Sequence, residues 1–235
     1  MVLLTCVSGY FPVNNKHNEK YNTCFTNTLS INCPYVFFTD KENIELIKSF
    51  RKDLPTHYVI CDIKDFYAYP LKDKMRKHWK HCPSVELNVI WNEKVFMVQK
   101  ASEINPFNSE WFFWIDAGMC VYRMMKPPNN YINEKLINSL PKDKFIYSRS
   151  DLLLPYDESQ VSNTNYYHHV SGTFVMHKSF VNQFAEIYRM YIDKLIDKKN
   201  IWTEQVILTH IFKDNRNMFY KLCDGYGRIA PLFFK

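Results

Sequence analysis

The chain is poor in glycine and lacks the short motifs that identify several common enzyme classes. Only five of its 235 residues are glycine, and they form no GxGxxG, Walker A or GxSxG pattern. An HExxH motif is also missing. These absences argue against Rossmann dehydrogenases, P-loop enzymes and the usual hydrolases.

Long apolar runs and closely spaced cysteines are absent as well. No apolar run approaches the roughly 18 residues that a membrane span needs, and the start "MVLLTCVSGYF" lacks the basic region and length of a secretory signal. The seven cysteines are odd in number and contain no CxxC spacing, so we expect buried free thiols rather than zinc or disulfides. These features predict a cytoplasmic protein without a membrane span.

The positive charge is modest and does not indicate a nucleic-acid partner. The formal net charge is +6, and the only dense basic run is "KDKMRKHWKH" at 72–81. Such a run is typical of a solvated helix or loop, or of a surface that attracts phosphates or acidic polymers. Since no nucleic-acid-binding motif is present, we expect no nucleic acid among the partners.

Strand and helix patterns alternate along the chain. Strands are expected at 2–7, 35–40, 56–63, 110–116, 144–150 and 172–177, and helices at 19–31, 41–51, 84–102, 178–197 and 203–214. This alternation predicts an α/β fold with a mainly parallel central sheet and helices on both faces. Neither an internal repeat nor a Gly/Ser linker divides the chain, so a single domain is expected.

Asp116 is the first candidate functional residue. It ends the apolar run "EWFFWIDAGMC", and Gly118 follows two residues later. Ligands of parallel sheets bind beyond the C-terminal ends of the strands, which is where this carboxylate should lie. Asp116 is therefore a candidate metal ligand, helix cap or base, and Gly118 either permits close approach of a ligand or simply makes a turn.

Two further positions carry a charge on or near a buried surface. Lys94 falls on the apolar stripe of the helix at 84–102, so its amine either snorkels to the edge or faces a phosphate. Glu204 opens the helix at 203–214 behind Thr203, a plausible N-cap, and the helix dipole alone would explain a carboxylate there. In "VSGTF", Gly172 is expected to precede a strand and to permit a turn or a close ligand approach.

Together these segments resemble a nucleotide-sugar glycosyltransferase of the GT-A type, and more narrowly the HtrL/YibB-like family of bacteria and large DNA viruses. The similar segments are "YNTCFTNTLSINCPYVFFTD", "IWNEKVFMVQKASEINPFNSEWFFWIDAG", "VSGTFV" and "TEQVIL". The resemblance implies a GT-A-like single domain over 1–235, with the donor nucleotide in about 1–120 and the acceptor in about 121–235. It also implies transfer of a sugar, with a UDP sugar favoured as donor, to a hydroxyl of a glycan or glycoprotein. A virus-encoded member would act in the host cytoplasm.

The resemblance assigns roles to individual residues. Asp116 stands at the family-wide Asp-x-Asp motif, whose carboxylates hold Mn²⁺ or Mg²⁺ on the donor diphosphate, but Gly118 replaces the second aspartate. His210 or Asp224 would then supply another metal ligand. Glu204 would act as the base or, with Gln205, contact the sugar or acceptor. The remaining donor-binding positions are Ser8, Tyr10, Asp40, Lys94 and Gly172.

Two other functions remain open at this point. A catalytically silent glycan-binding module would suit the missing second aspartate and the 17% aromatic content, since aromatic rings stack on sugars. A nucleotidyltransferase that makes the sugar nucleotide is the third alternative, although the segment "SGYFPVNNKHNEK" is not the Gly-rich basic loop such enzymes carry.

Overall fold

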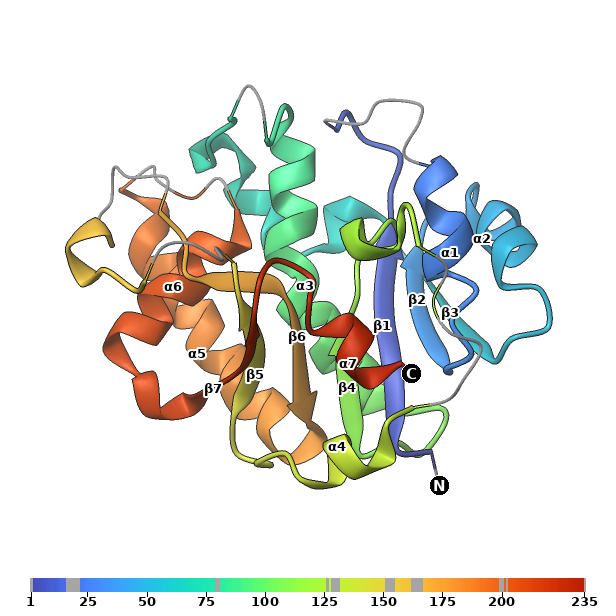
Figure 1. The fold of residues 1–235 in the computed structure, drawn as a ribbon. Helices are drawn as coiled ribbons and strands as arrows, with labels where there is room; N and C mark the ends of the chain where they lie inside the picture. Colours follow the sequence, from blue (N-terminus) through green and yellow to red (C-terminus); the bar gives the residue numbers. More distant parts are fainter. Residues whose placement is uncertain are drawn as a thin grey trace.

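A seven-stranded sheet forms the centre of the protein (Figure 1). The computed structural model describes residues 2–15, 22–78, 81–125, 127, 132–150, 155–161, 167–198, 201 and 203–234. The strands are β1 (Leu4–Tyr10), β2 (Tyr35–Thr39), β3 (Thr56–Ile60), β4 (Trp111–Trp114), β5 (Phe145–Arg149), β6 (Val170–His177) and β7 (Phe219–Asp224). All six expected strands are present, and the predicted α/β class is confirmed.

The strands run mainly in parallel, with one exception. Their order in the sheet is β3-β2-β1-β4-β6-β5-β7, and β6 is antiparallel to both β4 and β5 while every other pair is parallel. From β1 the chain moves outward through β2 and β3, and it then returns to add β4 on the other side of β1. Such a reversal of strand order is where ligands bind in open α/β sheets.

Helices cover both faces of the sheet, as predicted. The helices are α1 (Phe25–Thr28), α2 (Ile44–Arg51), α3 (Val85–Ile104), α4 (Glu134–Asn138), α5 (Lys178–Ile196), α6 (Glu204–Asp214) and α7 (Ala230–Phe233). Successive strand side chains point to opposite faces. Phe112 and Trp114 therefore pack in one core with α3, α5 and α6, while Trp111 and Phe113 pack in a second core with α1, α2, α4 and α7.

Two of the expected helix starts are confirmed by their caps. The Ser84 hydroxyl accepts a hydrogen bond from the Leu87 N–H at 3.2 Å, and the Thr203 hydroxyl accepts one from the Gln205 N–H at 3.5 Å. A side-chain oxygen at this position satisfies a backbone donor that the first turn leaves open. The caps fix where α3 and α6 begin, and hence where Lys94 and Glu204 lie.

Several expected boundaries were wrong. Ser8 and Gly9 do not end the first strand, because both still pair with β2, and β6 begins at Val170, so Gly172 lies inside it. The expected helix at 19–31 is reduced to α1, and its residues 19–21 lie outside the described part. We also expected two helices to close the chain, whereas β7 and α7 follow them. The edge strand β7 has exposed or half-buried side chains at most positions, so it lacks a clear apolar pattern.

Across the described ranges, no helix combines the length and the apolar character that crossing a membrane requires. All seven cysteines carry free thiols, of which Cys6, Cys33 and Cys82 are buried.

Candidate functional site

A cavity opens at the edge of the sheet where β1 and β4 end. Because these neighbouring strands are parallel, their C-terminal ends meet at this edge. The helix α3 supplies a second wall, and the segment that follows β7 supplies a third. The cavity is lined by Gly9, Tyr10, Phe11, Val13, Asn15, Leu87, Ile90, Trp91, Lys94, Trp114, Asp116, Gly118, Cys120, Arg123 and Tyr226.

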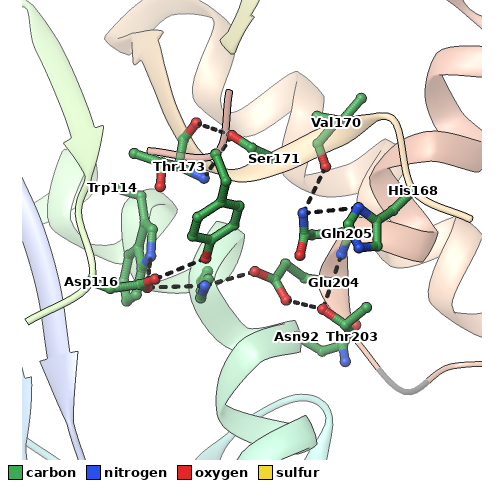
Figure 2. A network of polar contacts seen from close by, with 12 residues as sticks. Asn92, Trp114, Asp116, His168, Val170, Ser171, Thr173, Thr203, Glu204 and Gln205 are labelled. Carbon is green, nitrogen blue, oxygen red and sulfur yellow. Dashed lines mark hydrogen bonds and ion pairs between the residues drawn. The ribbon is translucent and has the colours of Figure 1, made fainter. Parts of the chain in front are cut away.

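Three charged side chains from distant parts of the chain meet beside this cavity, and Figure 2 labels two of them, Asp116 and Glu204. The Lys94 ammonium lies 3.0 Å from Oδ1 of Asp116 and 2.7 Å from Oε1 of Glu204. The second oxygen of Glu204 accepts a hydrogen bond of 2.6 Å from the Thr203 hydroxyl. The sequence picked out all three charged residues separately, and the fold joins them into one ion cluster.

Gly172 explains how this ion cluster fits beside the sheet. Trp114 pairs with Phe174 in the antiparallel β4–β6 ladder. The same register, continued by two residues, brings Asp116 opposite Gly172. A Cβ atom at Gly172 would overlap Oε1 of Glu204 and would lie 3.2 Å from the Lys94 ammonium. The glycine therefore makes room for two side chains, and it forms neither a turn before a strand nor part of the cavity wall.

Asp116 is held in its ionised form. Its Oδ1 accepts hydrogen bonds from the Trp114 indole N–H at 2.9 Å and from Lys94, and its Oδ2 accepts one from the Tyr226 hydroxyl at 3.3 Å. Burial by itself would raise the pKa of Asp116, but the charge of Lys94 and these hydrogen bonds outweigh it, so the pKa lies below its usual value. With 23% of its side chain exposed, this carboxylate is accessible from the cavity.

Lys94 contributes little exposed charge to the cavity. Only 3% of its side chain is exposed, so Lys94 does not snorkel to the edge, which was one of the two alternatives from the sequence. Burial alone would lower the pKa of Lys94, but Asp116 and Glu204 raise it above its ordinary value. The ammonium stays charged because two carboxylates surround it.

Glu204 and Gln205 lie outside the cavity wall. Glu204 is 2% exposed and sits behind Lys94, so it reaches no ligand in the cavity as a base would need to. The Gln205 side-chain amide donates to the Val170 carbonyl at 3.3 Å. Both residues thus bind α6 to the sheet and to α3 instead of facing the cavity.

The three donor-binding candidates of the first strands differ in position. Tyr10 ends β1 and lines the cavity. Ser8 is fully buried inside β1, whereas the expected strand at 2–7 would have left it in the following loop. Asp40 accepts hydrogen bonds from the N–H of Asn43 at 2.9 Å and from its side-chain amide at 2.7 Å, and it thereby shapes the turn into α2 outside the cavity wall.

The structure does not gather the expected metal ligands. His210 lies in the second half of α6, and Asp224 forms a salt bridge of 3.0 Å with Arg149 and another of 3.0 Å with Lys221. The carboxylate of Asp224 is therefore already paired with two cationic side chains. In the part of the chain that the structure describes, no three His, Cys, Asp or Glu side chains form a group that could hold a metal.

Asp116 alone can still offer one carboxylate oxygen to a divalent cation. Its Oδ2 has only the long bond from Tyr226 among the described residues, whereas Oδ1 is held by Trp114 and Lys94. Mg²⁺ that carries substrate phosphates needs only one or two protein carboxylates. Asp116 could therefore be the single protein ligand of an ion whose other ligands are phosphate oxygens and water.

Sequence reasoning missed Arg123 and Tyr226. Arg123 follows a short 3₁₀ turn, Cys120–Tyr122, and its Nε donates to the Gly118 carbonyl at 3.2 Å. Gly225 and Gly227 flank Tyr226 and both have positive φ, 102° and 72°. The sequence did contain a signal for Tyr226, because two of the five glycines flank it. Glycine is favoured where the backbone needs a positive φ, so this pair indicated an unusual turn around Tyr226.

A comparison with protein families assigns most of the chain to a family. A family model described as "Bacterial protein of unknown function (HtrL_YibB)" matches residues 59–229. Three of the four segments that suggested this family lie inside the matched range, and the segment at 21–40 lies before it. A search of curated proteins found no match. The chain belongs to the HtrL_YibB family.

Proposed function

We propose that this HtrL_YibB family member is a glycosyltransferase that moves a sugar from a nucleoside diphosphate sugar to a hydroxyl of a glycan or glycoprotein. A UDP sugar is the favoured donor. The observation that carries the proposal is the position of Asp116: an ionised carboxylate at the reversal point of the sheet, in the wall of a cavity that aromatic side chains also line. The donor nucleotide would lie in this cavity.

The aromatic side chains of the cavity could bind the parts of the donor that do not react, such as its nucleobase. Tyr10, Trp91 and Trp114 line the cavity with planar rings, and such rings pack against a nucleobase or a sugar. The Trp114 N–H is already bonded to Asp116, so the indole is fixed in orientation. These walls would hold the donor while its sugar–diphosphate bond faces Asp116.

The reaction breaks the bond between the anomeric carbon and a diphosphate oxygen and forms a bond to the acceptor oxygen, whose proton passes to the leaving diphosphate or to water. The low pKa of Asp116 suits a ligand better than a base, since a base works best with a pKa near the operating pH. A divalent cation bound at Asp116 would supply Lewis-acid stabilisation to the leaving diphosphate. Lys94 and the hydrogen bonds from Trp114 and Tyr226 keep Asp116 ionised and oriented.

A thermal-shift screen tests this proposal. UDP, GDP, CMP and common nucleotide sugars are added to the wild type, Asp116→Ala and Asp224→Ala, each with and without Mn²⁺. The proposal predicts that one nucleotide stabilises the wild type and Asp224→Ala by several degrees, with the larger shift in Mn²⁺, and leaves Asp116→Ala unchanged. Asp224 is the matched control because it is paired with Arg149 and Lys221 instead of Lys94.

The opposite result favours the glycan-binding alternative. If no nucleotide shifts the wild type with or without Mn²⁺, the proposal fails. Binding of saccharides in the absence of nucleotide and metal would then support a silent module with the same fold.

A further inference from the structure

We infer that Arg123 is the residue that recognises the phosphates of the ligand in this cavity. The inference rests on the proposed function, because it assigns a phosphate-bearing ligand to the same site. Arg123 was not a candidate from the sequence, and the resemblance had given this role to Lys94. The charges around the cavity support the reassignment.

Lys94 is already neutralised. Its ammonium has Asp116 at 3.0 Å and Glu204 at 2.7 Å, and its side chain is 3% exposed. One positive and two negative side chains give the ion cluster a net charge of −1 when all three are ionised. Without a divalent cation at Asp116, the exposed carboxylate of this cluster repels a diphosphate, and a second cationic side chain in the cavity wall would offset that repulsion.

Arg123 differs from the arginines that are paired elsewhere in the protein. Arg149, Arg189 and Arg216 each form a salt bridge with an aspartate or glutamate. Among the described residues, Arg123 has no carboxylate within ion-pair distance, and its Nε donates to the neutral carbonyl of Gly118 at 3.2 Å. Its positive charge is therefore available to a ligand.

Arg123 and Asp116 line the same cavity. Gly118, two residues after Asp116, lines it as well. The bond from Nε to Gly118 anchors the guanidinium and leaves its two terminal nitrogens without a bond to the described residues. A guanidinium presents a planar pair of donors that matches two phosphate oxygens. Arg123 would bind the phosphates with this pair of donors, in the cavity that Asp116 also lines.

Phosphate recognition by Arg123 predicts a specific binding pattern. Isothermal titration with UDP, UMP and uridine is compared for the wild type, Arg123→Gln, Arg123→Lys and Arg228→Gln. In Arg123→Gln we expect affinity for UDP to fall about 10- to 100-fold, the range expected for lost charge-assisted hydrogen bonds, while affinity for uridine changes less than about twofold. Arg123→Lys should recover part of the loss. Arg228 is the matched control, because it is exposed and lies outside the cavity wall.

Two outcomes would overturn the inference while the proposed function stands. One is that Arg123→Gln binds UDP as tightly as the wild type does. The other is that Arg123→Gln loses UDP and uridine to the same extent, which would indicate a damaged cavity and not a lost phosphate contact.

The inference can also be separated from a failure of the proposed function. If the wild type binds no nucleotide, titration with inorganic pyrophosphate decides whether Arg123 forms an anion-binding site. Pyrophosphate binding by the wild type that is lost in Arg123→Gln would support an anion site at Arg123. No pyrophosphate binding, or binding that Arg123→Gln retains, would overturn it.

Discussion

Gly172 and Glu204 share one space: the carboxylate of Glu204 occupies the position where any other residue at 172 would place its Cβ. Gly172 lies inside β6 and Glu204 begins α6, so the glycine decides how closely this helix approaches the sheet. The same gap admits the Lys94 ammonium. The ion cluster beside the cavity thus depends on residue 172 having no Cβ atom.

This shared space predicts a coupling between the two positions. Gly172→Ala should lower the free energy of unfolding by about 1–3 kcal/mol, the usual cost of overpacking a core, and the cost should fall in a Glu204→Ala background. Urea denaturation of the four proteins in this cycle measures it. Gly9→Ala is the control inside a strand, because its nearest neighbour is the flexible Met97 side chain at 3.2 Å. Equal costs of Gly172→Ala in both backgrounds would refute the coupling.

Lys94 is expected to be the most sensitive member of the ion cluster. Lys94→Met leaves Asp116 and Glu204 facing each other without a cation, which should cost about 3–5 kcal/mol. Adding Glu204→Gln should recover part of this loss, since one buried charge is removed. Lys178→Met is the control, because Lys178 is exposed and its salt bridge with Glu110 should contribute less than about 1 kcal/mol. Denaturation curves in which both lysine variants lose the same stability would contradict this role.

Glu93 predicts a pH-dependent contribution to stability. Burial raises the pKa of Glu93 from 4.5 to about 7. Between these values the folded state keeps a proton that the unfolded state releases, so Glu93 makes the protein less stable as pH rises from 4.5 to 7. Glu93→Gln should therefore gain stability over the wild type across this window, by up to about 3 kcal/mol above pH 7.

Denaturation at a series of pH values measures this gain. Glu103→Gln is the matched control, because Glu103 lies on the same helix and is exposed. A difference between Glu93→Gln and the wild type that stays constant from pH 4 to 8 would contradict the assignment.

The sequence could predict the fold class because strand and helix periodicities are local. The runs at β2, β4 and β5 are apolar enough to identify as strands, and the caps at Ser84 and Thr203 mark two helix starts. The antiparallel direction of β6 and the position of β7 at the edge depend on tertiary pairing, which no local pattern encodes. Gly172 was misread for the same reason, since its close neighbour is 32 positions away in the chain.

The site was only partly predictable. Asp116 and Lys94 were found because a charge on an apolar run is unusual. Their mutual contact, and the position of Glu204 behind Lys94, follow from packing between α3, β4 and α6. Arg123 lies in irregular structure after β4, where neither periodicity nor a known motif singles out a residue.

The most direct measurement is the release of UDP from a panel of UDP sugars, in Mn²⁺ and with mixed glycan and glycoprotein acceptors, by the wild type and Asp116→Asn. Circular dichroism confirms that the variant is folded. The account predicts that the wild type releases UDP from at least one donor and that Asp116→Asn does so at least about 100-fold more slowly, a loss typical of removing electrostatic stabilisation of a transition state. Release at the wild-type rate by folded Asp116→Asn, or no release by the wild type from any UDP sugar, would contradict it.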